Sequence, residues 1–274
     1  MKPSFLLRAS DGIDLQYYEQ PTENPVAVIC LVHGMGEHTG RYAHVGAFFA
    51  ARGMAVIGFD QRGHGKSGGK RGHTPSYGLL MESVAQLVET AAQKYPGVPL
   101  FLYGHSMGGN LALNYAIRNG KGIRAVVGSS PYLRLAFVPP AWKVNLARLM
   151  GKILPGLQQP TGLDVRMLSR DGAVVKAYEA DPLIHDKISV SYYLNIEEAG
   201  AWAVAHAAEL KVPALVFHGT GDRITSHEAT REFAEKSNGL AELKLWDGLY
   251  HETHNEPEKE QVLGFAADWI RAKI

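Results

Sequence analysis

The sequence has one cysteine, almost no net charge and no long hydrophobic run, and each absence excludes a class of protein. Lys and Arg number 28 against 27 Asp and Glu in 274 residues, so a net charge of +1 gives no attraction for a nucleic-acid backbone and we expect no nucleic-acid partner. Cys30 lies in an apolar run without a partner, which predicts a reduced, core-packed thiol and a cytoplasmic protein. The longest aliphatic run, 26–32, is far below the ~20 residues that span a bilayer, so we expect neither a membrane-spanning nor a signal segment.

The remaining composition is that of a globular protein with one large domain, because 46% of the residues are hydrophobic and 20% are charged. Short apolar runs without alternation predict strands buried on both faces, and they occur at 26–32, 54–57, 98–103, 125–127 and 212–217. Amphipathic stretches at 42–52, 79–95 and 111–119 separate them and predict crossover helices. The order is typical of an α/β fold with a doubly wound, mostly parallel sheet, preceded by a hairpin of 5–9 and 13–19.

This rhythm stops after residue 130 and resumes at residue 208. We therefore expect a core of 1–130 and 208–274 with a helical cap inserted at 131–207. Within the cap, Leu146, Leu149 and Ile153 follow helical spacing. Such an apolar face either packs on the core or touches lipid, so peripheral membrane contact through the cap stays open.

Two segments match Gly-x-Ser-x-Gly, the pattern of a nucleophile elbow, and their context separates them. Ser106 directly follows a predicted strand and opens a predicted helix, which is the sharp turn that this motif requires. Ser67 lies several residues beyond a strand, in a glycine-rich stretch that predicts a loop. We expect Ser106 to be the nucleophile.

A serine nucleophile needs a base and an acid, and residues of both types follow at predicted strand ends. Asp222 and His251 complete the chain order Ser, Asp, His that is typical of α/β-hydrolases. The backbone N–H groups of Met107 and Met35 are the candidate oxyanion hole, since one follows the nucleophile and the other lies in a glycine-rich loop after an early strand. His33, at the start of that loop, is expected to be structural.

Nucleotide and metal chemistry fit the sequence poorly, so we expect no cofactor and no metal. The stretch 63–68 satisfies Gly-x-Gly-x-x-Gly but does not lie directly between a strand and a helix. His251 and His254 are one residue too close for a His-Glu-x-x-His zinc motif.

The motifs together resemble the monoacylglycerol lipase and lysophospholipase family of the α/β-hydrolase superfamily over nearly the whole chain. They are His-Gly-Met-Gly-Glu-His at 33–38, Gly-Arg-Tyr at 40–42, Gly-His-Gly-x-Ser at 63–67, Gly-His-Ser-Met-Gly-Gly at 104–109, Tyr178 with Asp-Pro-Leu-Ile at 181–184, and Tyr-His at 250–251. The resemblance implies a triad of Ser106, Asp222 and His251, an oxyanion hole at Met35 and Met107, and a mobile cap over an acyl-chain tunnel.

The resemblance also implies that polar residues hold the glycerol end of a lipid ester substrate, and the matching positions are Glu37, Arg41, Tyr178 and His254. Glu37 and Arg41 are also spaced as a surface ion pair. The expected activity is hydrolysis of a monoacylglycerol through an acyl-enzyme. A lysophospholipase, a general carboxylesterase and a hydrolase-fold binding module are the alternatives, because a triad sets the reaction type and not the substrate.

Overall fold

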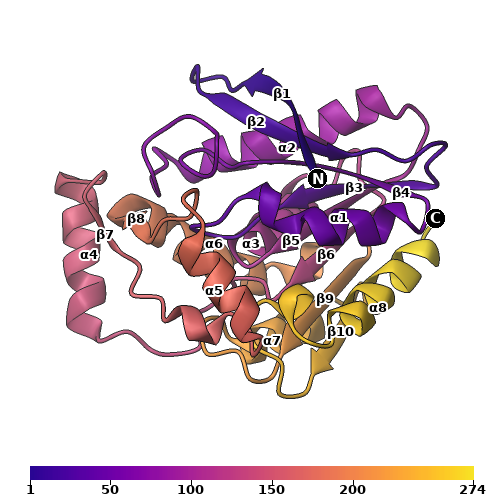
Figure 1. The fold of residues 1–274 in the computed structure, drawn as a ribbon. Helices are drawn as coiled ribbons and strands as arrows, with labels where there is room; N and C mark the ends of the chain where they lie inside the picture. The colour runs from indigo at the N-terminus through magenta and orange to yellow at the C-terminus, as the bar shows by residue number, and fades with distance from the viewer.

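A single eight-stranded sheet forms the centre of the molecule in the computed structural model, which describes residues 1–274 (Figure 1). The strand order is β1-β2-β4-β3-β5-β6-β9-β10. β1 and β2 pair antiparallel, β2 pairs antiparallel with β4, and the other pairs are parallel. The strands are β1 (Lys2–Arg8), β2 (Asp14–Gln20), β3 (Ala27–Val32), β4 (Met54–Phe59), β5 (Leu100–His105), β6 (Ala125–Ser129), β9 (Ala214–Gly219) and β10 (Ala241–Trp246).

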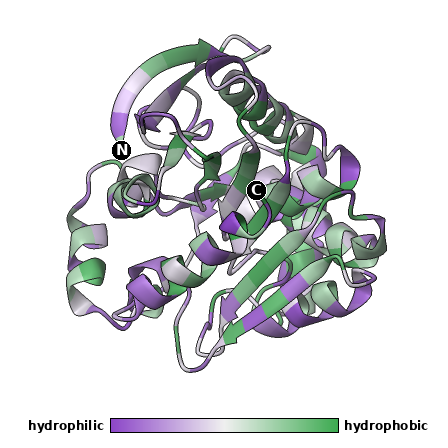
Figure 2. Cartoon of the chain, turned by 90° about the vertical axis from the view of Figure 1, so that its right-hand side faces the viewer, coloured by the Kyte–Doolittle hydropathy of each residue, from purple (hydrophilic) through white to green (hydrophobic).

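The five central strands are buried at every position, as their non-alternating apolar runs predicted. Successive residues of β3 point to opposite faces of the sheet, so Val28 and Cys30 belong to one core cluster and Ile29 to the other. The Cys30 thiol is buried, and burial raises its pKa to about 12. Figure 2 shows these strands as a largely hydrophobic centre under helices with hydrophilic outer faces.

Helices cover both faces of the sheet. α1 (Ala43–Ala50) and α8 (Lys259–Arg271) pack on one face, and α2 (Tyr77–Lys94), α3 (Met107–Arg118) and α7 (His227–Lys236) pack on the other. α2 begins where Ser76 caps it, the Ser76 hydroxyl accepting the Leu79 N–H. The arrangement confirms the predicted doubly wound α/β fold.

The segment between β6 and β9 is not wholly helical, which corrects the sequence prediction. It contains α4 (Ala141–Ile153), β7 (Gln158–Pro160), η2 (Val165–Met167), α5 (Gly172–Ala180), β8 (Lys187–Ser189), α6 (Val190–Ala205) and η3 (Ala207–Glu209). β7 and β8 pair antiparallel, and the Ser189 N–H donates to the Gly72 carbonyl at 2.8 Å, which ties this ladder to the loop after β4. Strands of three residues are too short to give a sequence period.

Two helices of this segment differ in burial. α6 packs on α3, where the Asn110 and Asn114 side chains each donate to an α6 carbonyl at 3.1 Å. α4 has no buried residue and stands at the edge of the molecule (Figure 1). The division of the chain into a core and a cap at residues 131 and 207 stays a prediction. No helix combines the length and apolar character needed to cross a membrane.

Candidate active site

Ser106 occupies a strained turn between β5 and α3. Its φ of 53° and ψ of −118° lie in a region that residues with a side chain rarely adopt. A Cβ at Gly104 would collide with the Gly108 carbonyl, and a Cβ at Gly108 would collide with the Val32 carbonyl. The two glycines therefore let the helix approach the strands closely enough to hold this turn, as the motif predicted.

Asp222 and His251, which lie 29 positions apart, meet beyond the ends of β9 and β10. The His251 Nδ1 atom lies 2.7 Å from Asp222 Oδ2, and the other carboxylate oxygen accepts the N–H groups of Ile224 at 2.7 Å and Thr225 at 3.1 Å. Burial raises the pKa of Asp222, but His251 and His218 outweigh burial and hold it well below its usual range. An ionised carboxylate only accepts hydrogen bonds, so His251 Nδ1 carries a proton and its Nε2 keeps a lone pair.

His251 is a stronger base than an ordinary histidine. Burial alone lowers its pKa, but the adjacent Asp222 carboxylate, together with Glu252 and Glu37, outweighs burial, and the net pKa is raised. A neutral imidazole of raised basicity, with a free nitrogen, can take a proton from a hydroxyl.

Ser67, the second motif serine, is used by the fold. Its hydroxyl donates to the Asp60 carbonyl at 2.5 Å and accepts the Gln16 N–H at 2.8 Å. The loop prediction for this residue is confirmed, because its oxygen joins β2 to the segment after β4.

A cavity of about 820 Å³ connects the elbow with the segment between β6 and β9. Ser106, His251, Met35, Glu37 and Tyr178 line it. The other predicted site residues, Asp222, Met107, Arg41 and His254, are not part of its lining. Its apolar wall includes Leu135, Phe137, Trp142, Val144, Leu146, Met150, Leu157 and Ile188.

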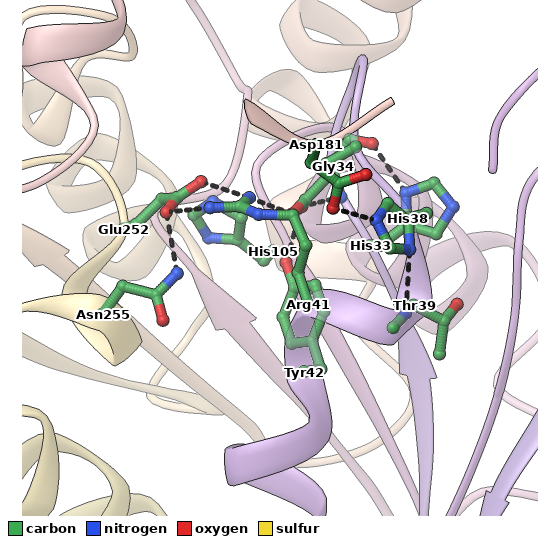
Figure 3. A network of polar contacts seen from close by, with 12 residues as sticks. His33, Gly34, His38, Thr39, Arg41, Tyr42, His105, Asp181, Glu252 and Asn255 are labelled. Carbon is green, nitrogen blue, oxygen red and sulfur yellow. Dashed lines mark hydrogen bonds and ion pairs between the residues drawn. The ribbon is translucent and has the colours of Figure 1, made fainter. Parts of the chain in front are cut away.

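Glu37 and Arg41 form an ion pair, as their spacing allowed, but the pair is buried and does not lie on the surface. Arg41 Nη1 lies 2.5 Å from Glu37 Oε2. Figure 3 shows the Arg41 guanidinium facing Glu252, whose two oxygens lie 2.6 Å from Nη1 and 2.7 Å from Nη2. Glu37 also accepts the Gly34 N–H and the Tyr42 hydroxyl, each at 2.6 Å. Glu252 is 211 positions from Arg41, and no sequence pattern indicated this contact.

The charges of this network are fixed by its geometry. Burial raises the pKa of Glu37, but Arg41 and the neighbouring histidines outweigh burial and lower it to about 2. Burial likewise lowers the pKa of Arg41, but Glu252 and Glu37 raise it. One guanidinium therefore faces two carboxylates, both of which line the cavity.

Tyr178 and His254 have different surroundings. The Tyr178 ring lies 4.8 Å from the Arg41 guanidinium carbon, on the wall of the cavity. The His254 ring stacks on Tyr42 at 4.8 Å and meets His105 edge-on at 4.7 Å, outside the lining. Of these two, the structure brings only Tyr178 to the surface that a ligand would touch.

The loop after β3 is held by His33, as expected of a structural histidine. Its Nδ1–H donates to the Gly34 carbonyl at 2.7 Å, and its Nε2 accepts the Gln61 N–H at 2.9 Å. A Cβ at Gly34 would lie 3.3 Å from the Ser106 Cβ, so this loop and the elbow are in close contact.

Comparisons with known proteins agree with this geometry. A family model described as serine aminopeptidase, S33, matches residues 23–258. The chain is 37% identical over 252 residues to a monoacylglycerol lipase of Mycolicibacterium smegmatis, covering 91% of this chain and 90% of that protein. It is also 35% identical to an uncharacterized abhydrolase domain-containing protein of Dictyostelium discoideum, of which it spans 27% of the length.

A solved structure is also similar to this chain. The crystal structure of a monoacylglycerol lipase from Paleococcus ferrophilus superposes with a TM-score of 0.88 at 35% identity, covering 95% of this chain and 99% of that chain. The fold, the elbow and these relatives together assign the chain to the monoacylglycerol lipase family of the α/β-hydrolase superfamily, as a serine ester hydrolase.

Proposed function

We propose that this protein hydrolyses monoacylglycerols to glycerol and fatty acid, with Ser106, His251 and Asp222 as the catalytic triad. The observation that carries the proposal is the ionised Asp222 carboxylate 2.7 Å from His251 Nδ1, in a site where His251 and Ser106 line one apolar cavity. The relatives named monoacylglycerol lipase support the substrate class.

The reaction follows from the roles of these groups. His251 Nε2 removes the Ser106 hydroxyl proton as the serine oxygen attacks the ester carbonyl. The tetrahedral intermediate then expels the alcohol, which leaves with the proton held by His251. Water, activated by the same imidazole, attacks the acyl-serine ester, releases the fatty acid and returns the proton to Ser106.

Two backbone N–H groups are proposed to stabilise the oxyanion. Met107 begins α3, where the first N–H groups of a helix have no partner within the helix. Met35 follows Gly34 in the loop held against Ser106. Each such donor contributes about 3 to 4 kcal/mol of transition-state stabilisation in a serine hydrolase.

The alcohol end of the substrate is proposed to meet Glu37 and Tyr178. Both line the cavity, and their oxygens offer partners to the two free hydroxyls of a monoacylglycerol. Arg41 and His254 act behind this surface, Arg41 by holding Glu37 and Glu252, and His254 by packing on His105.

The acyl chain is proposed to lie along the apolar wall. The volume of about 820 Å³ is near the top of the range of ~300 to 1,000 Å³ for small-molecule sites. Trp142 and Leu146 of α4 belong to this wall and are also exposed to solvent by 64% and 49%. Leu149 and Ile153 of α4 are exposed as well. We therefore include in the proposal that the enzyme contacts lipid through α4. The proposed location of the enzyme is the cytoplasm.

The triad is tested by labelling and turnover. A fluorophosphonate probe should modify Ser106, and Ser106→Ala should lose turnover of 1-oleoylglycerol by on the order of 10⁶-fold at unchanged thermal stability. Equal labelling of the Ser106→Ala protein would refute the assignment. The kcat/KM values for 1-oleoylglycerol, 1-oleoyl lysophosphatidylcholine and p-nitrophenyl acetate, measured together, separate a monoacylglycerol lipase from a lysophospholipase and a general esterase.

The lipid contact is tested by sedimentation with phosphatidylcholine and phosphatidylglycerol vesicles. The double variant Leu149→Ser with Ile153→Ser should bind vesicles at least about fivefold more weakly, because both side chains are exposed on α4 and outside the cavity lining. Its turnover of p-nitrophenyl acetate, a soluble ester, should match wild type. Unchanged vesicle binding would contradict the contact.

A further inference from the structure

A second imidazole lies against the Asp222 carboxylate. His218 is the penultimate residue of β9, its side chain is fully buried, and its Nε2 atom lies 2.9 Å from Asp222 Oδ2. Its Nδ1 atom lies 2.8 Å from the Thr230 hydroxyl on α7. No step of the proposed reaction uses this residue.

One carboxylate oxygen therefore serves two histidines. Asp222 Oδ2 is the atom that accepts from His251 Nδ1 at 2.7 Å, and the Thr225 hydroxyl lies 3.0 Å from it. Because an ionised carboxylate only accepts, His218 Nε2 carries a hydrogen. The Thr230 hydroxyl then donates to the His218 Nδ1 lone pair, so the neutral imidazole has both nitrogens satisfied.

His218 stays neutral in this position. Burial lowers its pKa and Asp222 raises it, and with the nearby His251 and His227 also lowering it, the net pKa is lowered. The side chain is consequently a fixed N–H dipole that points its positive end at Asp222 Oδ2, and it carries no charge of its own.

We propose that His218 is a positioning residue that shares Asp222 Oδ2 with His251, which orients the carboxylate and limits the basicity of the catalytic imidazole. This inference rests on the proposed function, because it assigns His251 as the base. The dipole stabilises the carboxylate, but the same positive end opposes the positive charge that forms on His251 during proton transfer. Replacing His218 by an apolar side chain removes that opposition and should make His251 easier to protonate.

The other ionisable groups around the two rings stay in place when His218 is changed. Besides Asp222, the groups that face His251 are Glu252, Glu37, His105 and His254, and the Arg41 guanidinium lies between the two glutamates. The group that faces His218 from α7 is His227, with a ring-centroid separation of 6.3 Å. A change in the titration of His251 therefore reports on His218 alone.

The test is the pH profile of kcat/KM for p-nitrophenyl butyrate in wild type, His218→Leu, His218→Gln and the control His227→Leu. The acid limb of His218→Leu should move to higher pH by about 0.5 to 1 unit. This is the expected effect of losing one hydrogen bond from the neutral His218 imidazole to the buried Asp222 carboxylate. His218→Gln should restore the wild-type limb, because its amide N–H can replace Nε2–H. His227→Leu, which removes an imidazole without contact to Asp222, should keep the limb.

Two outcomes overturn the proposal. They are an unmoved limb in folded His218→Leu protein and a limb in His218→Gln that equals that of His218→Leu. If His218→Leu does not fold, ¹⁵N NMR of the wild type at pH 7 to 9 decides. A neutral His218 that carries its hydrogen on Nε2 is required, and a hydrogen on Nδ1 alone contradicts the proposal. If the fluorophosphonate labels Ser106 but the acid limb of the pH profile does not move, only the inference about His218 is refuted. If Ser106 is not labelled, the proposed function is refuted as well.

Discussion

Removing the Arg41 guanidinium should destabilise the protein far more than removing an exposed arginine. In Arg41→Met the aliphatic stem stays and two buried carboxylates, Glu37 and Glu252, lose their cation. Breaking a buried ion pair from one side costs about 3 to 5 kcal/mol. Burial raises the Glu37 pKa, and Arg41 is the largest of the causes that lower it to about 2, so the pKa shift has the same direction as this cost.

The assay is thermal unfolding at several pH values. At about 2 °C per kcal/mol for a chain of this size, the midpoint of Arg41→Met at pH 7 should fall by about 6 to 10 °C. Because the folded-state pKa of Glu37 is depressed, its stabilising contribution is complete above pH ~4.5 and is lost as the pH falls toward 2. The gap between wild type and variant should therefore narrow below pH 4.5.

The control is Arg166→Met, which breaks the exposed pair with Asp164. Its midpoint should be indistinguishable from that of wild type, because exposed ion pairs contribute little. An Arg41→Met midpoint within 2 °C of wild type at pH 7, or a gap that is constant from pH 7 to 3, would refute the reasoning that buried charge compensation stabilises this network.

Three further predictions concern the elbow, the charge of the cavity and the second motif serine. Gly108→Ala should prevent folding to the native state, because the new Cβ would collide with backbone atoms. Gly264→Ala in α8 places its Cβ in open space and should raise the free energy of unfolding by about 0.5 to 1 kcal/mol. Circular dichroism melts of both variants check this. Glu252→Gln removes a negative charge from the cavity wall, so it should raise the ratio of kcat/KM for 1-oleoylglycerol 3-phosphate to kcat/KM for 1-oleoylglycerol by ~30-fold. This factor corresponds to about 2 kcal/mol, the repulsion of like charges ~8 Å apart at an effective dielectric of 20. An unchanged ratio in a micellar assay would count against the prediction. Ser67→Ala should keep full turnover yet lose about 1 to 3 kcal/mol of stability in urea unfolding, because its two hydrogen bonds are lost; a loss of turnover would contradict its structural role.

Much of the fold was predictable because its signals are local. Uninterrupted apolar runs gave the buried strands, and the glycines around Ser106 gave the turn from β5 into α3. The order of Ser106, Asp222 and His251 pointed to one edge of the sheet, since parallel strands end on the same side. The short β7 and β8 pair was missed, because three residues carry no measurable period.

The polar partners of the site were less predictable than its motif residues. Glu252 is adjacent to His251 in the chain, yet its role depends on Arg41, which the 3₁₀ helix η1 (Thr39–Tyr42) before α1 brings from the other end of the sequence. In the sequence, His218 directly follows the apolar run 212–217 and carries no signal beyond that of a turn residue. The turn that follows β9 places Asp222, four residues later, against the His218 ring.

The sequence by itself determined which segments become strands and helices, and which serine is held in a strained turn, because hydrophobic period and glycine geometry act over a few residues. Tertiary structure alone decided that Glu252 faces Arg41, that His251 meets Asp222 and which side chains line the cavity. The two polar contacts join residues 211 and 29 positions apart, and burial changes the pKa of such groups only after the chain has folded.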